Sequence, residues 1–544
     1  MNVTAKLKYI DFDIVSRYLA SLGIEDVDEY LFPSGWGIEE YKHYPNIEEA
    51  VLTFRANLSS GRPIHIVMDS DCDGACSAAI MYNFLIYCNV PKDRIVVHHH
   101  TGKQHGIKDL VDEIVSYPPG LLIVPDAGTN DTKECKTIEE KGWDIIVCDH
   151  HMIEKKNNHA IVINNQSPGV NNKYLSGAGV TYKFCEAVAD SYKQPTVDIP
   201  DYCDIVAVSL VSDVCNLTSL ENRTYMYYGL ENINNPFLVF LFDKVCKRKG
   251  NTPESIGWNI APLANALARS DIQETKTLFF DALVGNITPE EALKQMRKVK
   301  RLQDEAVKSV VEEIEPDLPL DNKVIVGFTE PENASFTGLI CNKFTGKYGK
   351  PTILLRDTKH GSWSGSLRSP VPLATKINES GIATAQGHEE ACGIIVKKKK
   401  LEEFKQWLES LDLSSKPSVE VVAIVEPEDI TLDVCQKISR WNQLWGHGVD
   451  SPTFYIETTI ESKNIFIFRK STTTIKLSFG ELSCLKFFAS EQEANEFENI
   501  NKVKIGLIVG ELGVNEYNGV VTPQCIIKDY EIIEDEEESW EDLF

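Results

Sequence analysis

The sequence predicts an α/β protein of several domains, with a parallel sheet in its first half and a small β-barrel near its end. From residue 63 to about 163, apolar β-rich runs alternate with helical patterns, which is typical of a parallel sheet flanked by helices. From residue 419 to about 533, alternating strand patterns indicate the barrel. At 544 residues the chain is too long for one core, so we expect three or four domains.

Changes of pattern along the chain place the boundaries of these domains. We expect an N-terminal helical segment at residues 1–45, a parallel-sheet domain at 46–285, a long connecting helix at 286–320, a second α/β domain at 321–415, an OB-like β-barrel at 416–533 and an acidic tail at 534–544. Residues 414–417 (SSKP) look like the linker before the barrel.

Short apolar runs mark the strands of the two sheets that precede the barrel. The predicted strands of the first sheet are Ile64–Met68, Leu121–Val124, Ile145–Cys148 and Ile161–Ile163. Residues 177–285 are predicted to be mostly helical. The second unit should contain strands near Val324–Phe328 and Thr352–Leu355.

A long helix should join the two α/β units. Thr288 is a predicted N-cap, Pro289 suits the first helical position and Glu291 completes the pattern of a capping box. No Gly or Pro follows until about Ile314, which gives ~26 residues, or roughly 39 Å. The helix is rich in Lys and Arg, so its outer face is either simply solvated or faces DNA.

Bulk composition excludes several classes of protein. The formal net charge of −26 argues against a nucleic-acid coat protein, although a nuclease needs only a local basic surface. The chain has no run of about 18 apolar residues, so no membrane span is predicted. The N-terminus lacks the pattern of a signal peptide, so we expect a cytoplasmic protein without membrane contact. The 14 cysteines are scattered, which indicates reduced thiols rather than a zinc site.

The strongest local signal is a cluster of carboxylates after the first strand. Asp69, Asp71 and Asp73 alternate with small residues and are followed by Gly74 and a helix start. Three carboxylates at a strand end repel one another unless a cation neutralises them. A calcium loop of the EF-hand type would need a Glu where Ile80 stands, and a purely structural turn is the other alternative.

Two more strands end in the same kind of residue. The second runs into Asp126, and the third runs into Asp149, His150 and His151. A later apolar run ends at Asp213, which taken alone could be an ordinary helix cap. Together these side chains could hold two divalent ions about 3.5–4 Å apart, the arrangement that activates water against a phosphodiester. The mixed nitrogen and oxygen donors suit Mn²⁺ somewhat better than Mg²⁺.

In these residues the chain resembles the DHH phosphoesterase superfamily and, within it, the RecJ-type nucleases. Its motifs appear in order as Asp69–Gly74, Asp126, Asp149–His151 and Val208–Asp213, with Leu175–Val180 and Ala261–Arg269 between and after them. Residues Gly365–Ser369 and Gly387–Gly393 are similar to the two motifs of the associated DHHA1 domain, and Trp445–Gly448 is similar to the opening of the RecJ OB-fold. The resemblance thus covers nearly the whole chain.

The resemblance implies a metal-binding role for six residues. One ion would be held by Asp71 and Asp126, with Asp69, and the other by Asp73, Asp126, His150 and Asp213. The implied cofactors are two divalent ions, Mn²⁺ or Mg²⁺.

The resemblance also implies the residues that would meet the substrate. Asp149 would orient a metal-binding histidine, His151 would contact the scissile phosphate and His388 would line the active cleft. Ser366 and Arg368 would bind a 5′-terminal phosphate, with Arg269 and His100 as further substrate-binding candidates.

Two stretches depart from the family pattern. The family usually has an Arg ahead of a GYG-like turn, whereas this chain reads His98–Gly106 there, with His100 at about the Arg position. The GGGH-like motif reads Ala385-Gln386-Gly387-His388. Both differences could change how the protein binds the end of the substrate strand.

The implied activity is hydrolysis of single-stranded DNA from the 5′ end by a metal-dependent exonuclease. The alternative is a phosphodiesterase for short oligoribonucleotides or cyclic dinucleotides, although the long helix and the OB-like barrel favour a polymer. A non-catalytic scaffold is disfavoured, because every metal-ligand position is intact.

The acidic tail ends in Trp540-Glu541-Asp542-Leu543-Phe544, which has three large apolar side chains behind a run of carboxylates. One hypothesis is that it binds a sliding clamp or a single-strand-binding protein. The alternatives are a solvated tail and a tail that mimics DNA in the chain's own basic cleft.

Overall fold

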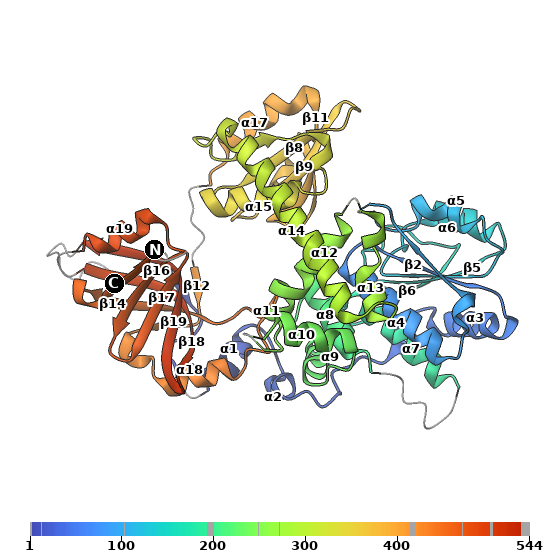
Figure 1. Cartoon of the computed structure of the whole chain (residues 1–544), viewed down its shortest axis with the longest axis horizontal. Helices are drawn as coiled ribbons and strands as arrows, with labels where there is room; N and C mark the ends of the chain where they lie inside the picture. Colours follow the sequence, from blue (N-terminus) through green and yellow to red (C-terminus); the bar gives the residue numbers. More distant parts are fainter. Residues whose placement is uncertain are drawn as a thin grey trace.

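The computed structural model describes most of the chain, with folded units at the right, top and left of Figure 1. The described residues are 3–11, 13–102, 104–192, 201–247, 250–270, 272–413, 419–469, 472–500 and 504–534. The predicted linker at 414–417 and the predicted partner-binding end of the tail lie outside these residues.

The first unit contains a sheet of five parallel strands in the order β3-β2-β4-β5-β6. The strands are β2 Ile64–Met68, β3 Ile95–His99, β4 Leu121–Pro125, β5 Asp144–Asp149 and β6 Ile161–Asn164. The chain leaves β2 toward β3 on one side and then returns to β4 on the other. The carboxyl ends of β2 and β4 therefore flank the point where strand order reverses, which is where open α/β sheets bind ligands.

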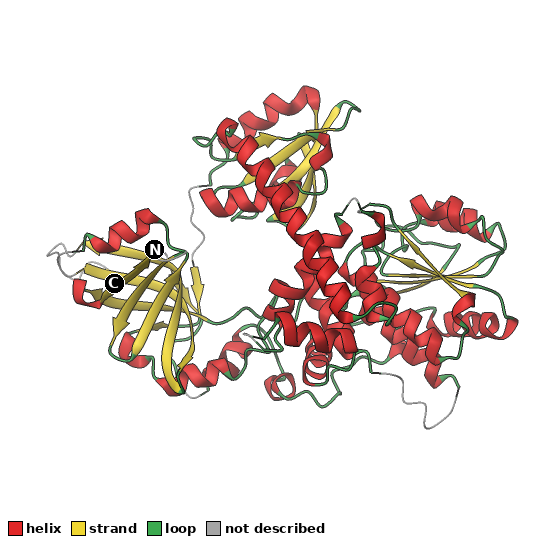
Figure 2. Ribbon diagram, viewed as in Figure 1, coloured by secondary structure: helices red, strands yellow, loops and turns green. Residues whose placement is uncertain are grey.

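Helices cover both faces of this sheet (Figures 1 and 2). One face packs against α3 Ile47–Ser60, α4 Cys72–Tyr87 and α7 Gly177–Asp190. The other face packs against α5 Val111–Ile114 and α6 Thr132–Glu139, where a separate apolar cluster forms. Both faces are buried, which explains why the strands are continuously apolar.

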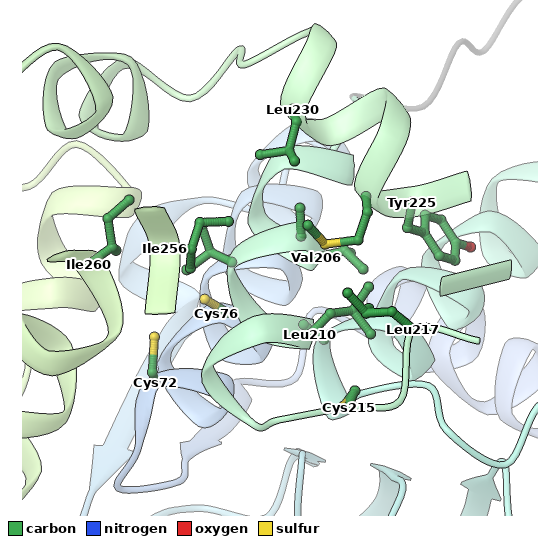
Figure 3. Packing of buried hydrophobic residues seen from close by; sticks show 14 of the residues in the cluster. Cys72, Cys76, Val206, Leu210, Cys215, Leu217, Tyr225, Leu230, Ile256 and Ile260 are labelled. Atoms are coloured by element: carbon green, nitrogen blue, oxygen red, sulfur yellow. The ribbon is translucent and has the colours of Figure 1, made fainter. Parts of the chain in front are cut away.

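A helical layer follows the sheet, as the sequence predicts for residues 177–285. Its further helices are α8 Cys203–Ser212, α9 Leu220–Glu231, α10 Pro236–Val245, α11 Pro253–Ser255, α12 Ala261–Ala268 and α13 Leu278–Leu283. Figure 3 shows how Cys76 of α4 and Val206 and Leu210 of α8 lie in one core with Ile256 and Ile260. This packing fixes the start of α4 relative to the end of α8, and both ends carry candidate metal ligands.

The predicted long helix is α14, Pro289–Ile314, and it leads from the first unit to the second. The hydroxyl of Thr288 accepts a hydrogen bond from the backbone N–H of Glu291 at 3.4 Å, which confirms the predicted N-cap. On its inner side α14 buries an apolar stripe that includes Leu293, Met296 and Val299.

The second unit has a mixed sheet in the order β10-β11-β9-β8-β7, in which only β7 and β8 are parallel. Its elements are β7 Ile325–Phe328, α15 Thr337–Tyr348, β8 Thr352–Asp357, β9 Ser362–Arg368, α16 Ala374–Glu379, β10 Ala383–Gly387, β11 Ala391–Lys397 and α17 Leu401–Ser410. The two predicted strands are confirmed as β7 and β8.

The last unit is a seven-stranded sheet in the order β13-β14-β18-β19-β17-β16-β15. Its elements are β13 Ile424–Val425, α18 Leu432–Ser439, β14 Thr453–Ile460, β15 Ile465–Arg469, β16 Thr473–Phe479, β17 Leu482–Phe487, α19 Glu491–Glu498, β18 Lys504–Tyr517 and β19 Val520–Glu534. With this unit the predicted fold class, an α/β multidomain chain with an OB-like end, is confirmed.

The first residues differ from the sequence prediction, which expected only helices there. Helices α1 Ile14–Ser21 and α2 Val27–Leu31 are present, but Val3–Ala5 form strand β1, which pairs in parallel with β12, Val419–Val421. A strand of three residues has too little periodicity to be seen in sequence, and it forms here because β12 offers it a partner.

No helix in the described part of the chain is long and apolar enough to span a membrane. The cysteines are free, and all except the half-buried Cys88 are buried.

Candidate metal centre

The start of α4 presents the first group of aspartates. Strand β2 is fully buried and is followed directly by Asp69, and Asp71 caps α4 by accepting a hydrogen bond from the N–H of Gly74 at 3.1 Å. A Cβ on Gly74 would lie 2.6 Å from the Cβ of Asp69, so only glycine fits at this position. The tight turn therefore brings Asp69, Asp71 and Asp73 to one end of the strand.

Asp73 is held in place by the start of α7. The backbone N–H groups of Gly177 and Ala178 donate to its two carboxylate oxygens at 2.8 and 3.0 Å. The hydroxyl of Ser209 on α8 donates to the same carboxylate at 2.5 Å and lies 2.6 Å from the hydroxyl of Ser176. Sequence patterns assign no role to Ser176 or Ser209, because only the packing of α7 and α8 turns these hydroxyls toward Asp73.

Asp126 follows β4 in a left-handed backbone conformation, with φ of 67°, and is buried. Its N–H donates to the carbonyl of Cys148 at 2.7 Å, which ties it to the neighbouring strand. Its Oδ1 is buried without a hydrogen bond, 3.2 Å from Nε2 of His150. A buried carboxylate oxygen left in this way fits a ligand of a metal ion.

His150 lies among three carboxylates. Its Nε2 is 3.2 Å from Oδ1 of Asp126, 3.7 Å from Oδ2 of Asp213 and 3.8 Å from Oδ2 of Asp73. Asp213 reaches the group from the C-cap of α8. The ligand atoms of Asp73, His150 and Asp213 lie within 4.8 Å of one another, as do those of Asp126, His150 and His151.

Repulsion between the buried carboxylates of the cluster favours a bound cation. Burial, followed by the charges of neighbouring aspartates, raises the pKa of Asp126 well above its usual range. Burial and Asp73 likewise raise the pKa of Asp213 to about 6, although His150 opposes the shift. Burial and the charges of Asp69 and Asp73 raise the pKa of Asp71. Divalent metal ions would remove this mutual repulsion, so the residues present fit a divalent metal cofactor.

Asp149 acts on the backbone and on the second histidine. Its carboxylate accepts hydrogen bonds from the N–H groups of Thr129, His150 and His151, and from Nδ1 of His151 at 2.8 Å. Burial opposes its ionisation, but the contacts with His151, Thr129 and His150 together outweigh burial and hold the pKa of Asp149 well below its usual range. The hydrogen bond to Asp149 raises the pKa of His151 to about 9. The pair thus fixes the turn after β5.

Ser366 and Arg368 lie together beside the N-terminus of α15. The Ser366 hydroxyl is 2.8 Å from that of Thr337, and a Cβ on Gly338 would lie 2.8 Å from the guanidinium of Arg368. Burial first, and then the positive charge of Arg368, lowers the pKa of Arg269, on which Asp71 has the opposite effect. Arg269 therefore interacts electrostatically both with Arg368 of the second unit and with Asp71 of the carboxylate cluster.

The two remaining candidates occupy different environments. His388 is exposed in the turn between β10 and β11, and no hydrogen bond or ion pair joins its ring to the described residues of the carboxylate cluster. His100 is 3% exposed and its Nε2 lies 3.7 Å from Oδ1 of Asp69. Their predicted roles stay predictions. The sequence overlooked His105, whose Nδ1 is 2.5 Å from Oδ2 of Asp69.

Two parts of the chain match known families. The DHH family N-terminal domain matches residues 63–210, which contain five of the six predicted metal ligands, and the RecJ OB domain matches residues 423–529. The chain thus contains a DHH domain and a RecJ OB domain. The second match coincides with the seven-stranded sheet, and the first coincides with the parallel sheet and the helices through α8.

Similar proteins match most of the length of this chain. A putative prophage-derived single-strand DNA-specific exonuclease, YorK of Bacillus subtilis, is 28% identical over 96% of each chain. The single-stranded-DNA-specific exonuclease RecJ of the same species is 25% identical over 90% of this chain and 64% of its own length. The crystal structure of RecJ from Thermus thermophilus with Mn²⁺ has a TM-score of 0.75 at 18% identity and covers 97% of this chain and 79% of that one, which shows a common fold.

Proposed function

We propose that this chain is a metal-dependent exonuclease that hydrolyses single-stranded DNA from its 5′ end with two divalent ions. The observation that carries the proposal is the carboxylate and histidine cluster at the switch point of the parallel sheet. The names of the relatives above support single-stranded DNA as the substrate, and the matched OB domain fits a single-stranded polymer.

Two groups of ligands lie near the carboxyl ends of β2, β4 and β5. We assign Asp69 and Asp71 to one ion, and Asp73, His150 and Asp213 to the other. Asp126 is proposed as the shared ligand, because its buried carboxylate interacts electrostatically with the aspartates of both groups. Two bound ions supply an activated water and neutralise charge on the leaving oxygen of the phosphodiester.

The protein's own groups then position the phosphate. Because Nδ1 of His151 is hydrogen bonded to Asp149, its Nε2 is left to meet the scissile phosphate from a half-exposed side chain. His388 is proposed to approach the substrate from the hairpin of the second unit. His100 stays a predicted substrate contact through its place beside Asp69.

The second unit supports the proposed polarity. Ser366, Thr337 and Arg368 surround the first turn of α15, a 12-residue helix whose N-terminal N–H groups favour an anion. Arg269 adds a second guanidinium from the first unit. A terminal 5′-phosphate suits this group of side chains, since an arginine can bind phosphate bidentately.

End-labelled oligonucleotides test the proposed function directly. With Mn²⁺, 5′-labelled single-stranded DNA should release labelled short products first, whereas circles and duplexes should resist. Asp126→Ala should reduce the rate by at least about 1000-fold, since one change weakens both ion positions, and Asp112→Ala, an exposed carboxylate on α5, should not. Label released first from the 3′ end, or an Asp126→Ala rate within tenfold of the wild type, would refute the proposal.

The same assay separates the second candidate function. A preference for di- or trinucleotides of RNA, or for a cyclic dinucleotide, over a long DNA strand would favour the small-substrate phosphodiesterase. A clamp or a single-strand-binding protein as partner of the tail stays a prediction, because the tail beyond residue 534 is outside the described residues.

A further inference from the structure

The loop after β3 brings a histidine to the first two aspartates. His105 lies in the loop that leads from β3 toward residue 108, and its Nδ1 is 2.5 Å from Oδ2 of Asp69. The ligand atoms of His105, Asp69 and Asp71 all lie within 4.8 Å of one another. This group is separate from the groups that contain His150, so each side of the centre has an imidazole.

Backbone contacts hold His105 in this position. The N–H of Gly106 donates to Oδ1 of Asp69 at 3.3 Å, and the N–H of Ile107 donates to Oδ2 of Asp131 at 2.9 Å. Gly106 has a φ of 79°, and a Cβ there would lie 2.1 Å from the same Asp131 oxygen. The turn thus requires glycine, and it anchors the residue after His105 to the carboxylate itself.

A second histidine indicates independently that this edge faces a ligand. The side chain of His100 is 1% exposed, and among the described residues only the backbone of Gly106 comes near hydrogen-bonding distance of its ring, without a well-formed hydrogen bond at either nitrogen. Its Nε2 points to the Asp69 carboxylate from 3.7 Å, which is beyond hydrogen-bond distance. A buried polar group without a partner costs about 1–3 kcal/mol, so its position beside Asp69 indicates a group that the protein atoms do not supply.

We propose that His105 is a ligand of the metal ion held by Asp69 and Asp71, an inference that rests on the two-ion function proposed above. His105 would then do for this position what His150 does for the other. A nitrogen donor at both positions raises the affinity for Mn²⁺ relative to Mg²⁺, and it raises the affinity for Co²⁺ still further. The metal preference of this chain would therefore be set by a loop that departs from the family pattern.

Direct counting of bound Mn²⁺ tests the inference. Electron paramagnetic resonance of free Mn²⁺ during a titration should show two bound ions in the wild type. His105→Phe should keep one of them and weaken the other by about tenfold or more, because even changes outside the ligand sphere cost 10–100-fold. At the weakened position the ratio of Mn²⁺ to Mg²⁺ affinity should fall toward one. Of the three ions, Co²⁺ should show the largest loss of affinity.

His43→Phe is the matched control, because His43 is a half-exposed histidine paired with a carboxylate, Glu39, at 2.9 Å. It should bind both ions like the wild type. His105→Asn, a smaller change, should repeat the loss, and thermal unfolding without metal checks that each variant is folded. Wild-type stoichiometry and affinity in both His105 variants would overturn the inference.

The outcome is distinguishable from failure of the proposed function. A chain that degrades no DNA but loses one Mn²⁺ in His105→Phe keeps the ligand assignment and loses the activity. A chain that degrades DNA and binds both ions without His105 keeps the activity and loses the assignment. A wild type that binds no Mn²⁺ overturns both.

Discussion

At the scale of single residues, buried polar groups lie on both faces of the first sheet. On the face away from α4, Nδ1 of His65 is 2.7 Å from Nε2 of His98, whose Nδ1 is 2.6 Å from Glu113. The rings of Trp143 and Tyr117 stand edge-on to His65, which is fully buried. This chain of hydrogen bonds lies in the apolar layer under α5 and α6 and gives that layer a titratable group.

We predict that His65 makes the stability of the first unit depend on pH. Burial, and then the charge of His98, lowers the pKa of His65 to about 4, whereas the unfolded chain takes up the proton near 6.5. The contribution of the neutral ring is therefore complete above pH 6.5 and is lost as the pH falls to about 4. It amounts to at most about 3 kcal/mol.

Denaturant unfolding between pH 7 and 4 measures this contribution. His65→Leu should flatten the dependence of the free energy of unfolding on pH, while His360→Phe, at an exposed site, should leave it unchanged. Equal slopes for His65→Leu and the wild type would assign the pH dependence to other groups.

At the scale of elements, the start of α7 packs directly against two of the candidate metal ligands. A Cβ on Gly177 would lie 2.3 Å from Oδ1 of Asp126, and the N–H of Gly177 binds Asp73. Two contacts of Gly177 thus explain the small residues in the motif at Leu175–Val180. A side chain at 177 would displace one ligand, and a shift of the helix would release the other.

Gly177→Ala should therefore lower both stability and metal affinity. Overpacking a tight site costs about 1–3 kcal/mol, and the displaced Asp126 should weaken Mn²⁺ binding at both positions. Gly346→Ala is the matched control, because Gly346 is also helical but has nothing within 4 Å of its Cβ position. Calorimetric titration with Mn²⁺ and thermal unfolding compare the two, and wild-type values for Gly177→Ala would contradict the role given to this close approach.

At the scale of the whole molecule, segments far apart in sequence hold the units in place. Strand β1 pairs with β12 at the entrance to the last unit, and the hydroxyl of Tyr18 donates to the carbonyl of Asp450 at 3.2 Å. Helix α14 links the first unit to the second, and the charge of Arg368 contributes to lowering the pKa of Arg269. The end of a DNA strand could therefore contact side chains from two units at once.

Arg368→Ala should reduce the preference for a 5′-phosphate without removing the chemistry. A charged hydrogen bond contributes about 1.5–3 kcal/mol, so kcat/KM on a 5′-phosphorylated strand should fall about 10- to 100-fold. A 5′-hydroxyl strand should lose far less. Arg356→Ala, which removes an arginine from the neighbouring strand β8, is the control. An equal loss on both substrates would mean that Arg368 does not bind the 5′-phosphate.

The sequence by itself determined the order and type of the elements that carry the site. Apolar runs that end in Asp69, Asp126 and Asp149 predict strands, and parallel strands present their carboxyl ends at one edge. The proximity of these side chains could therefore be predicted from local patterns alone. The same holds for α14, whose cap and length follow from Thr288 and from the absence of breakers.

Only the tertiary structure decided which other groups meet the carboxylates. His105 lies in a loop that departs from the family pattern, and its position depends on β3 pairing beside β2 and on the turn at Gly106. Ser209 is one of several small residues on an apolar helix until α8 packs against α4 and turns it toward Asp73. Strand β1 forms only because a partner more than 400 residues away offers its edge. Local sequence fixes backbone periodicity, whereas contacts between distant segments depend on strand order and loop closure, which no short pattern encodes.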